Sequence, residues 1–146
     1  MTLPDGYEID TDPARLDRTM IHRYLSEESY WAPGIPRDVV DRAIDGSLCF
    51  GIYARDGAQV GFGRLVTDRA TFAYLGDVFV LPGHRGNGLS KALVAAMQAH
   101  PELQGLRRWL LATRDAHGLY AALGFAPLAQ PGNFMTIQRR NPYQPS

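Results

Sequence analysis

The stretch from Val80 to Met97, VLPGHRGNGLSKALVAAM, constrains the fold of this chain more than any other feature of its sequence. It begins as an apolar segment with the character of a strand, passes through a glycine-rich loop and continues with apolar residues at helical spacing. This order predicts a helix whose first turn lies open beside the loop. Because the first N–H groups of a helix have no partner within it and carry partial positive charge, the stretch predicts an anion site.

The residues of the loop favour an anion. Gly86 and Gly88 carry no side chain, so the oxygen atoms of a ligand can approach the main chain closely. Arg85 adds a positive charge with several donors, and no acidic residue occurs between Asp77 and Glu102. A tight connection between a strand and a helix, which also needs flexible residues, remains the alternative explanation of the glycines.

Three familiar loop motifs do not match. A P-loop needs Lys followed by Ser or Thr after its last glycine, where this chain has Leu89-Ser90, and a dinucleotide fingerprint needs a third glycine where it has Lys91. A nucleophile elbow also fails, because no downstream Asp and His complete a triad. We therefore expect a different kind of phosphate-binding loop, while a nucleotide-binding domain that uses the glycines in its own way stays open.

The remaining pattern alternates between the periods of helices and strands, which predicts an α/β fold with a mixed sheet. We expect one domain over residues 1–146, because the sequence contains neither repeats nor a linker. Asp12 is the expected cap of the first helix, with proline at its first position. The predicted elements are a strand at 7–10, helices from 13 and at 37–45, strands at 48–54, 59–66 and 71–81, a helix from 88, a strand at 108–112, a helix at 116–123 and a strand at 134–138.

Composition narrows the classes of partner. Fifteen basic residues balance fifteen acidic ones, so we expect no nucleic-acid partner and no anionic membrane surface. The sequence shows no leader pattern and no apolar run of the roughly 18 residues that cross a bilayer. Cys49, the single cysteine, lies in a strand pattern and is expected to be a small buried residue of a cytoplasmic protein. The histidines show no metal-ligand spacing, so we expect no metal.

Two motifs resemble a known superfamily. The loop VLPGHRGNGLS is similar to the coenzyme A loop of the GNAT N-acetyltransferases, Arg/Gln-x-x-Gly-x-Gly/Ala, with Arg85 and Gly88 in place and Ser90 at the last small position. Residues 116–125, AHGLYAALGF, resemble the Ala-x-x-x-Tyr-x-x-x-Gly-Phe helix of the same family. The order of the predicted elements agrees, so the resemblance covers nearly the whole chain. It implies a GNAT-like fold, in which helices flank a mixed, mostly antiparallel central sheet and a splayed strand pair holds acyl-CoA.

The resemblance also implies an activity. Such a domain transfers the acetyl group of acetyl-CoA directly to an amine within a ternary complex. Gly76 is the expected place of a bulge that opens the slot for the pantetheine arm. Thr113 stands where many relatives have a helix-starting asparagine near the coenzyme, and it can cap that helix itself. The residues implied to hold the coenzyme are Val78, Phe79 and Val80 along the strand edge, Arg85, Gly86, Asn87, Gly88, Leu89 and Ser90 in the loop, and Thr113.

Tyr120 and Asp77 are the candidate catalytic residues. Tyr120 matches the tyrosine of the family, and a tyrosine with its ordinary pKa of about 10 can give a proton to a departing thiolate at neutral pH. Asp77 stands where many relatives carry a carboxylate, and it could take the proton of the amine through water. A bulge position or a partner for a neighbouring arginine explains Asp77 equally well.

The acceptor is expected near the segment between the first two helices. Tyr30 and Trp31 could hold a cationic amine by cation–π contact and Glu27 by charge, although the end of a solvated helix explains the same residues. We expect a small-molecule amine and leave a homodimer open. The alternative function is a non-catalytic acyl-CoA sensor or interaction module.

Overall fold

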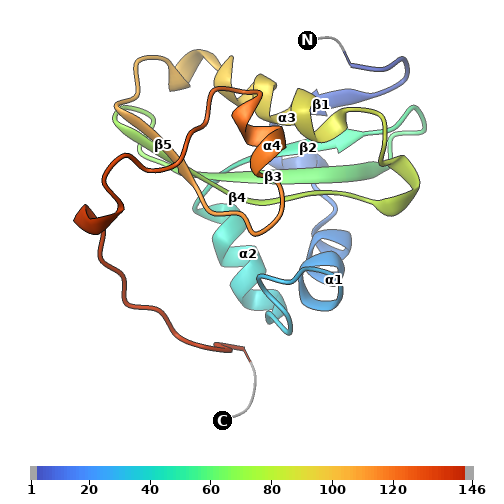
Figure 1. Ribbon diagram of the computed structural model, residues 1–146. Helices are drawn as coiled ribbons and strands as arrows, with labels where there is room; N and C mark the ends of the chain where they lie inside the picture. Colours follow the sequence, from blue (N-terminus) through green and yellow to red (C-terminus); the bar gives the residue numbers. More distant parts are fainter. Residues whose placement is uncertain (1–2, 144–146) are drawn as a thin grey trace.

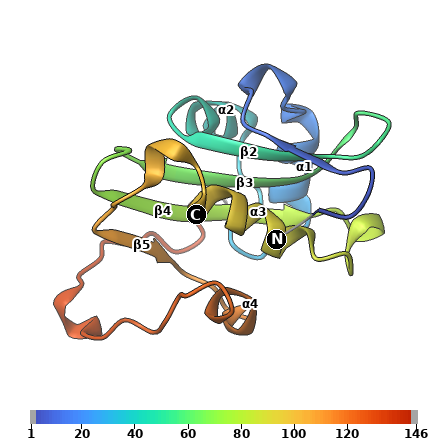
Figure 2. The same ribbon diagram turned by 90° about the horizontal axis from the view of Figure 1, so that it is seen from above.

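The central sheet contains five strands in the order in which they occur in the chain (Figure 1; Figure 2). The computed structural model describes residues 3–143. The first four strands are antiparallel and the fifth is parallel to the fourth. The predicted fold class, a mixed and mostly antiparallel sheet flanked by helices, is therefore confirmed. The strands are β1 (Glu8–Asp10), β2 (Leu48–Tyr53), β3 (Gln59–Thr67), β4 (Phe72–Val80) and β5 (Arg108–Leu111).

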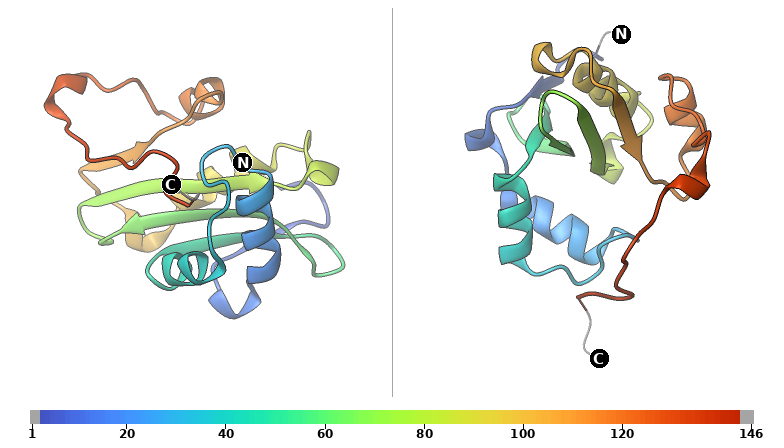
Figure 3. Two further views of the ribbon diagram at one scale, coloured as in Figure 1. Left: turned by 90° about the horizontal axis from the view of Figure 1, so that it is seen from below. Right: turned by 90° about the vertical axis from the view of Figure 1, so that its left-hand side faces the viewer.

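Helices cover both faces of the sheet (Figure 3). The helices α1 (Arg18–Glu27) and α2 (Arg37–Asp45) pack on one face, and α3 (Leu89–Gln98) and α4 (His117–Ala121) lie on the other. Each face has its own apolar core, because side chains alternate along a strand. Phe50 contributes to the core under α3, and its neighbour Cys49 is buried against α1 and α2, as predicted for that cysteine. Within residues 3–143 no helix is long and apolar enough to span a membrane.

Local signals placed several elements correctly. The helix predicted over residues 37–45 is α2, which ends at Gly46. The Asp56-Gly57 turn joins β2 to β3, with the Asp56 carboxylate accepting a hydrogen bond of 2.9 Å from the Ala58 amide. The helix after the glycine loop is α3, and its cap, Gly88, has the left-handed φ of 72° that glycine adopts readily.

The cap predicted for the first helix is wrong. The Asp12 side chain accepts from the Ala14 amide, but it caps only the 3₁₀ turn Pro13–Arg15. The helix α1 begins at Arg18, and Asp17 caps it by accepting from the Met20 amide. Asp12-Pro13 does start a helical turn, but the chain leaves that turn at Leu16, which has an extended backbone, before the true helix begins.

The strand predicted over residues 134–138 is absent. Those residues form no ladder, and the chain from Gly124 to Tyr143 runs outside the sheet (Figure 1; Figure 2). The alternation of side chains predicted a strand, but a strand also needs a partner edge within reach. The last helix is shorter than predicted as well, since α4 ends at Ala121 rather than Leu123.

A bulge in β4 and the early end of β5 together open the sheet. Phe62 pairs with Phe79 and Arg64 pairs with Gly76, so Asp77 and its neighbour stand opposite Gly63 alone. A Cβ atom at Gly63 would lie 2.5 Å from the Met97 methyl group of α3, so a larger residue there would require that side chain to shift. Beyond residue 75, β4 continues without β5, because the parallel pairing covers only its first four residues, 72–75. The expected opening is therefore present; the bulge adjoins Gly76, and the backbone of Asp77 takes the positive φ, 56°.

Candidate active site

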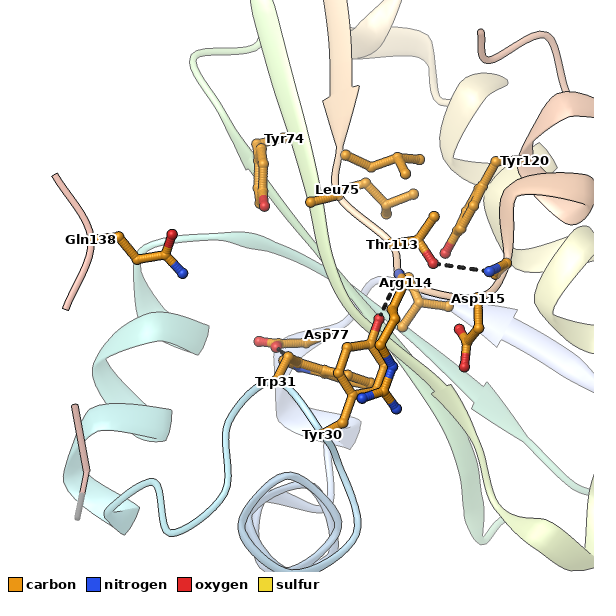
Figure 4. A pocket seen from close by; sticks show the side chains of 14 residues that line it. Tyr30, Trp31, Tyr74, Leu75, Asp77, Thr113, Arg114, Asp115, Tyr120 and Gln138 are labelled. Atoms are coloured by element: carbon orange, nitrogen blue, oxygen red, sulfur yellow. Dashed lines mark hydrogen bonds between the residues drawn. The ribbon is translucent and has the colours of Figure 1, made fainter. Parts of the chain in front are cut away.

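A hollow of about 490 Å³ lies where β4 and β5 separate (Figure 4). Its walls come from β4, from the segment that follows β5, from the loop after α1 and from α4. The lining residues include Tyr30, Trp31, Tyr74, Asp77, Val78, Thr113, Arg114, Asp115, Tyr120 and Gln138. The structure thus brings together both candidate catalytic residues and two of the three candidate acceptor residues.

Tyr120 closes the α4 side of this hollow. The side chain is 9% exposed and packs edge-on against Phe125, with ring centroids 5.8 Å apart. Its hydroxyl points towards the side where Thr113 and Asp115 lie, and no other described residue is hydrogen bonded to it (Figure 4). Burial, followed by the nearby Tyr30 and Asp115, raises the pKa of Tyr120 above its ordinary value. The phenol is therefore protonated at neutral pH and free to donate its proton.

Both carboxylate oxygens of Asp77 already accept hydrogen bonds. The Trp31 indole N–H donates to one oxygen at 2.8 Å, and the Arg64 Nε–H donates to the other at 2.8 Å. Arg64 also donates to the Ser47 hydroxyl at 3.1 Å, which fixes the guanidinium. With the side chains of Asp77 and Arg64 13% and 22% exposed, this is a largely buried ion pair. The arginine partner considered for Asp77 is present, and its carboxylate holds Trp31 in place.

Tyr30 and Arg114 form a second fixed pair at the mouth of the hollow. The Arg114 amide donates to the Tyr30 hydroxyl at 3.0 Å, and the Arg114 guanidinium stacks on the Tyr30 ring at 3.9 Å from its centroid. Tyr30 and Trp31 meet edge to face with centroids 5.0 Å apart, and both remain more than a third exposed. Two aromatic rings and a guanidinium therefore border the entrance in one defined arrangement.

A second hollow, of about 290 Å³, lies over the glycine loop. It is lined by Val80, the loop, Ser90, Lys91 and Leu119. In the part of the chain that the structure describes, the backbone N–H groups from Gly86 to Lys91 have no acceptor. A Cβ atom at Gly86 or Gly88 would meet nothing within 4 Å, so the main chain is open to a ligand. Consecutive free amides at the start of a helix fit a pyrophosphate.

Arg85 ties this loop to the rest of the molecule. Its Nε–H donates to the Val80 carbonyl at 2.9 Å, and a terminal N–H donates to the Tyr24 hydroxyl at 3.0 Å. Tyr24 in turn stacks on Phe79, with ring centroids 4.0 Å apart. The guanidinium therefore contributes its charge to the hollow while it holds the loop against β4 and α1.

The edge of β4 connects the two hollows. Val78 lines the hollow beside Tyr120, and Val80 lines the hollow over the loop. The side chain of Phe79 points to the opposite face, where it is 4% exposed in the core with α1 and α2. An extended ligand with an anionic end could lie along this edge, because β5 has already left it.

The comparisons with known proteins agree with this geometry. The family model described as the acetyltransferase (GNAT) family matches residues 11–125. The chain belongs to the GNAT acetyltransferase family. A protein of Gibberella zeae that is described as a candidate acetyltransferase is 35% identical over 78% of this chain and 75% of its own.

Solved structures of the family share the architecture. A crystal structure from Xanthomonas campestris, described as a candidate acetyltransferase of the GNAT family, is 54% identical and superposes with a TM-score of 0.94 over 99% of this chain and 100% of that one. An aminoglycoside N-acetyltransferase in complex with CoA is 23% identical, with a TM-score of 0.63 over 96% of this chain and 99% of that one. That second likeness shows the fold.

Glu27 lies outside the hollow beside Tyr120, whereas Thr113 lies in its wall. Glu27 is exposed at the end of α1 and does not line the acceptor hollow, so the carboxylate in the hollow wall nearest Trp31 is that of Asp77. Thr113 lines the hollow, and its hydroxyl accepts from the Ala116 amide at 3.1 Å. The cap predicted at Thr113 is wrong, because α4 begins at His117 and its cap position is Ala116, which makes no side-chain cap bond.

Sequence reasoning missed the polar residues Tyr74, Arg114, Asp115 and Gln138 in the wall of the hollow and Arg64, which supports it. Arg64 and Tyr74 lie in the two strands that the bulge joins. The face of the sheet to which each side chain points therefore could not be read from the alternation of residues alone. Arg114 follows directly after Thr113, and the charge at the end of a predicted strand was the one signal that could have indicated it.

Proposed function

We propose that this chain is an N-acetyltransferase that moves the acetyl group of acetyl-CoA directly to a small primary amine. The observation that carries the proposal is the continuous path along the exposed edge of β4. The free amides of Gly86–Lys91 lie at one end of that path, and the Tyr120 phenol lies at the other. Acetyl-CoA matches both ends of this path, because its pyrophosphate and its thioester are separated along the molecule.

Binding relies on the main chain. The loop amides and Arg85 hold the pyrophosphate, and the peptide groups of Val78 and Val80 pair with the amides of the pantetheine arm as an added strand would. An N–H group of this edge would also stabilise the charge that develops on the thioester oxygen. The family membership and the CoA complex of an aminoglycoside N-acetyltransferase of this fold support the choice of acetyl-CoA.

The chemistry needs two proton movements. The amine nitrogen forms a bond to the acetyl carbon while the carbon–sulfur bond breaks, and sulfur leaves with the electron pair. Tyr120 gives its proton to that sulfur, and its raised pKa keeps the proton available across the neutral range. Solvent then restores the proton to Tyr120.

The amine loses its own proton to water in this proposal. Asp77 keeps both oxygens bound to Trp31 and Arg64, so we assign it a positioning role and leave the direct base role to the test below. Trp31 offers a ring face for a cationic amine, whereas the Arg114 guanidinium already stacks on the Tyr30 ring. The hollow of about 490 Å³ has room for a small acceptor. The single cysteine, free and buried, supports a cytoplasmic setting.

The test is a panel of small amines incubated with acetyl-CoA, with free thiol measured as the product. Amine-dependent thiol release with acetylated amine in the mass spectrum supports the proposal. Saturable binding of acetyl-CoA without turnover of any amine would instead favour the sensor. Binding of nucleotides in preference to CoA would overturn the proposal.

A further inference from the structure

Arg114 brings a positive charge to the hollow beside Tyr120 that no carboxylate of residues 3–143 neutralises. Its guanidinium stacks on the Tyr30 ring at 3.9 Å from the centroid, and its backbone amide donates to the Tyr30 hydroxyl at 3.0 Å. Within the same residues it takes part in no ion pair. Stacking covers one face of a guanidinium and leaves the N–H groups in its plane open, so the side chain is ready to bind an anion.

The charged groups in the wall of this hollow comprise one internal pair and two unpaired residues. Asp77 is bound to Arg64 at 2.8 Å, so that pair adds no net charge. Asp115 lies in the same wall and has no cationic partner within the part of the chain that the structure describes. Among the described lining residues, Arg114 is the one basic side chain. The wall therefore presents one free positive charge and one free negative charge to a ligand.

Arg114 lies at the acceptor end of the site and not over the glycine loop. Tyr30 meets Trp31 edge to face with ring centroids 5.0 Å apart, so the aromatic pair and Arg114 gather on one side of the hollow (Figure 4). The pKa of Tyr120 is raised by burial and then by Tyr30, so this group also lies near the proposed acid. The hollow over the glycine loop is lined by other residues.

We propose that the acceptor is an amine that also carries a carboxylate, as an amino acid does, and that Arg114 selects it by binding this carboxylate. The inference rests on the proposed acetyl transfer and narrows its acceptor. The Trp31 ring face and Asp115 attract the ammonium before it loses its proton, while the guanidinium takes the carboxylate. Tyr30 contacts both Trp31 and Arg114, so the two binding groups are held side by side.

The charges of the wall favour a carboxylate over a phosphate group. A phosphate monoester carries a charge of about −1.5 to −2 at neutral pH. A single guanidinium balances only part of that charge, and the Asp115 carboxylate in the same wall would repel the remainder. A carboxylate carries one charge, and its two oxygens match the planar fork of the arginine.

The first test compares amino acids with the amines that lack only the carboxyl group. Each common amino acid is paired with its decarboxylated amine, for example phenylalanine with phenethylamine, and free thiol is measured with saturating acetyl-CoA. With kcat/KM expressed per unprotonated amine, we expect the amino acid of at least one pair to be favoured about 10–100-fold, as for one hydrogen-bonded charge pair. Phosphoethanolamine and ethanolamine form the corresponding pair for a phosphate group.

Substitution of Arg114 then shows which group binds the carboxylate. Arg114→Gln removes the charge but keeps the backbone amide that bonds to Tyr30. The KM for the amino acid should rise about 10–100-fold, whereas the KM values for the decarboxylated amine and for acetyl-CoA should not change. Arg114→Lys retains the charge without the fork and should keep part of the preference.

Arg108→Gln is the matched control. Arg108 also stacks on an aromatic ring, with its guanidinium 4.9 Å from the centre of Phe134, but it does not line the hollow beside Tyr120. This variant should show the wild-type preference for the amino acid.

The outcomes separate the acceptor from the reaction. Equal kcat/KM within every pair, or a preference for phosphoethanolamine, would contradict the carboxylate and leave acetyl transfer standing. A preference that survives in Arg114→Gln, or a rise in the KM for acetyl-CoA instead, would refute the role of Arg114. Failure of every amine to release thiol would refute the acetyl transfer itself, and this inference with it.

Discussion

The two hollows along β4 are built by opposite means. The hollow over the glycine loop comes almost entirely from one continuous stretch, residues 80–91, and its binding groups are backbone amides. The hollow beside Tyr120 comes from segments far apart in the chain, and its polar groups are side chains held by specific partners. The first site can tolerate many side chains but few backbone changes. The second depends on each contact, so it can differ in specificity while the first stays the same.

The two sites should therefore fail in different ways. A substitution in the loop should lower the affinity for the coenzyme and nothing else. A substitution in the hollow beside Tyr120 should change kcat or the acceptor KM and leave the affinity for the coenzyme unchanged. Four substitutions test this contrast.

Gly88→Asp should have the largest effect. A carboxylate about 4 Å from a bound phosphate opposes binding by about 4 kcal/mol at an effective dielectric of 20, so we expect CoA affinity to fall by about 1,000-fold. Gly88→Asn is the matched control, because Asn has the same shape without the charge and tolerates the φ of 72°. Calorimetry compares the two variants. Equal affinity in Gly88→Asp and the wild type would show that the phosphate lies elsewhere.

Tyr120→Phe should have the second-largest effect, which we expect in kcat. The ring and its contact with Phe125 remain, but the proton is lost, so kcat should fall by about 10²–10⁴-fold with CoA affinity unchanged. In the wild type, the alkaline limb of the pH–rate profile should begin as the pH rises through the raised pKa of Tyr120, because deprotonation removes the acid. Tyr74→Phe removes another phenol from the same hollow and should retain most activity. A larger loss in Tyr74→Phe would move the acid role to Tyr74.

Trp31→Ala should raise the acceptor KM more than the CoA KM. A cation–π contact contributes about 1–2 kcal/mol when it is desolvated, which corresponds to roughly a 5–30-fold change. Trp31→Phe keeps a ring but loses the N–H bond to Asp77, so it separates the ring contribution from the hydrogen bond. If the acceptor KM of Trp31→Ala stays at the wild-type value, the aromatic pair is a structural wall and the acceptor binds elsewhere.

Asp77→Asn should have the smallest effect on kcat. Asn retains the size of Asp77 and tolerates its φ of 56°, but it weakens the link to Arg64. For a positioning role we expect a roughly fivefold rise in acceptor KM, about 1 kcal/mol for one hydrogen bond, and an unchanged acid limb of the pH–rate profile. Arg64→Gln, which removes the arginine partner of the same ion pair, should give the same rise in acceptor KM and the same unchanged acid limb.

The base role predicts a different outcome. If Asp77 takes the proton of the amine, Asp77→Asn should lower kcat by about 10²–10⁴-fold and change the acid limb. Arg64→Gln would then retain the acid limb. The pair of variants therefore distinguishes the two roles even if both proteins are less stable.

Prediction from sequence succeeded where the signal was local. The bounds of α2, the hairpin at Asp56-Gly57 and the start of α3 at Gly88 depend on residues within a few positions of one another. The first helix cap failed because the Asp12-Pro13 signal marks only a 3₁₀ turn, whereas α1 is capped by Asp17, which no proline follows. The strand at 134–138 failed because alternation of side chains is a local signal, whereas a strand also needs a paired neighbour, and these residues pair with none among those described.

By itself the sequence determined the class of fold, the family and the loop for an anion, because a strand, glycines and a helix start in succession fix where free amides must point. Only the tertiary structure decided what surrounds the Tyr120 side of the hollow. Trp31 meets Asp77 across 46 positions and Tyr30 meets Arg114 across 84, and the bulge at Asp77 turns its carboxylate towards Trp31 and Arg64. Such contacts depend on where the strands separate and on which side chains fill the space, and neither is written in any short stretch of residues.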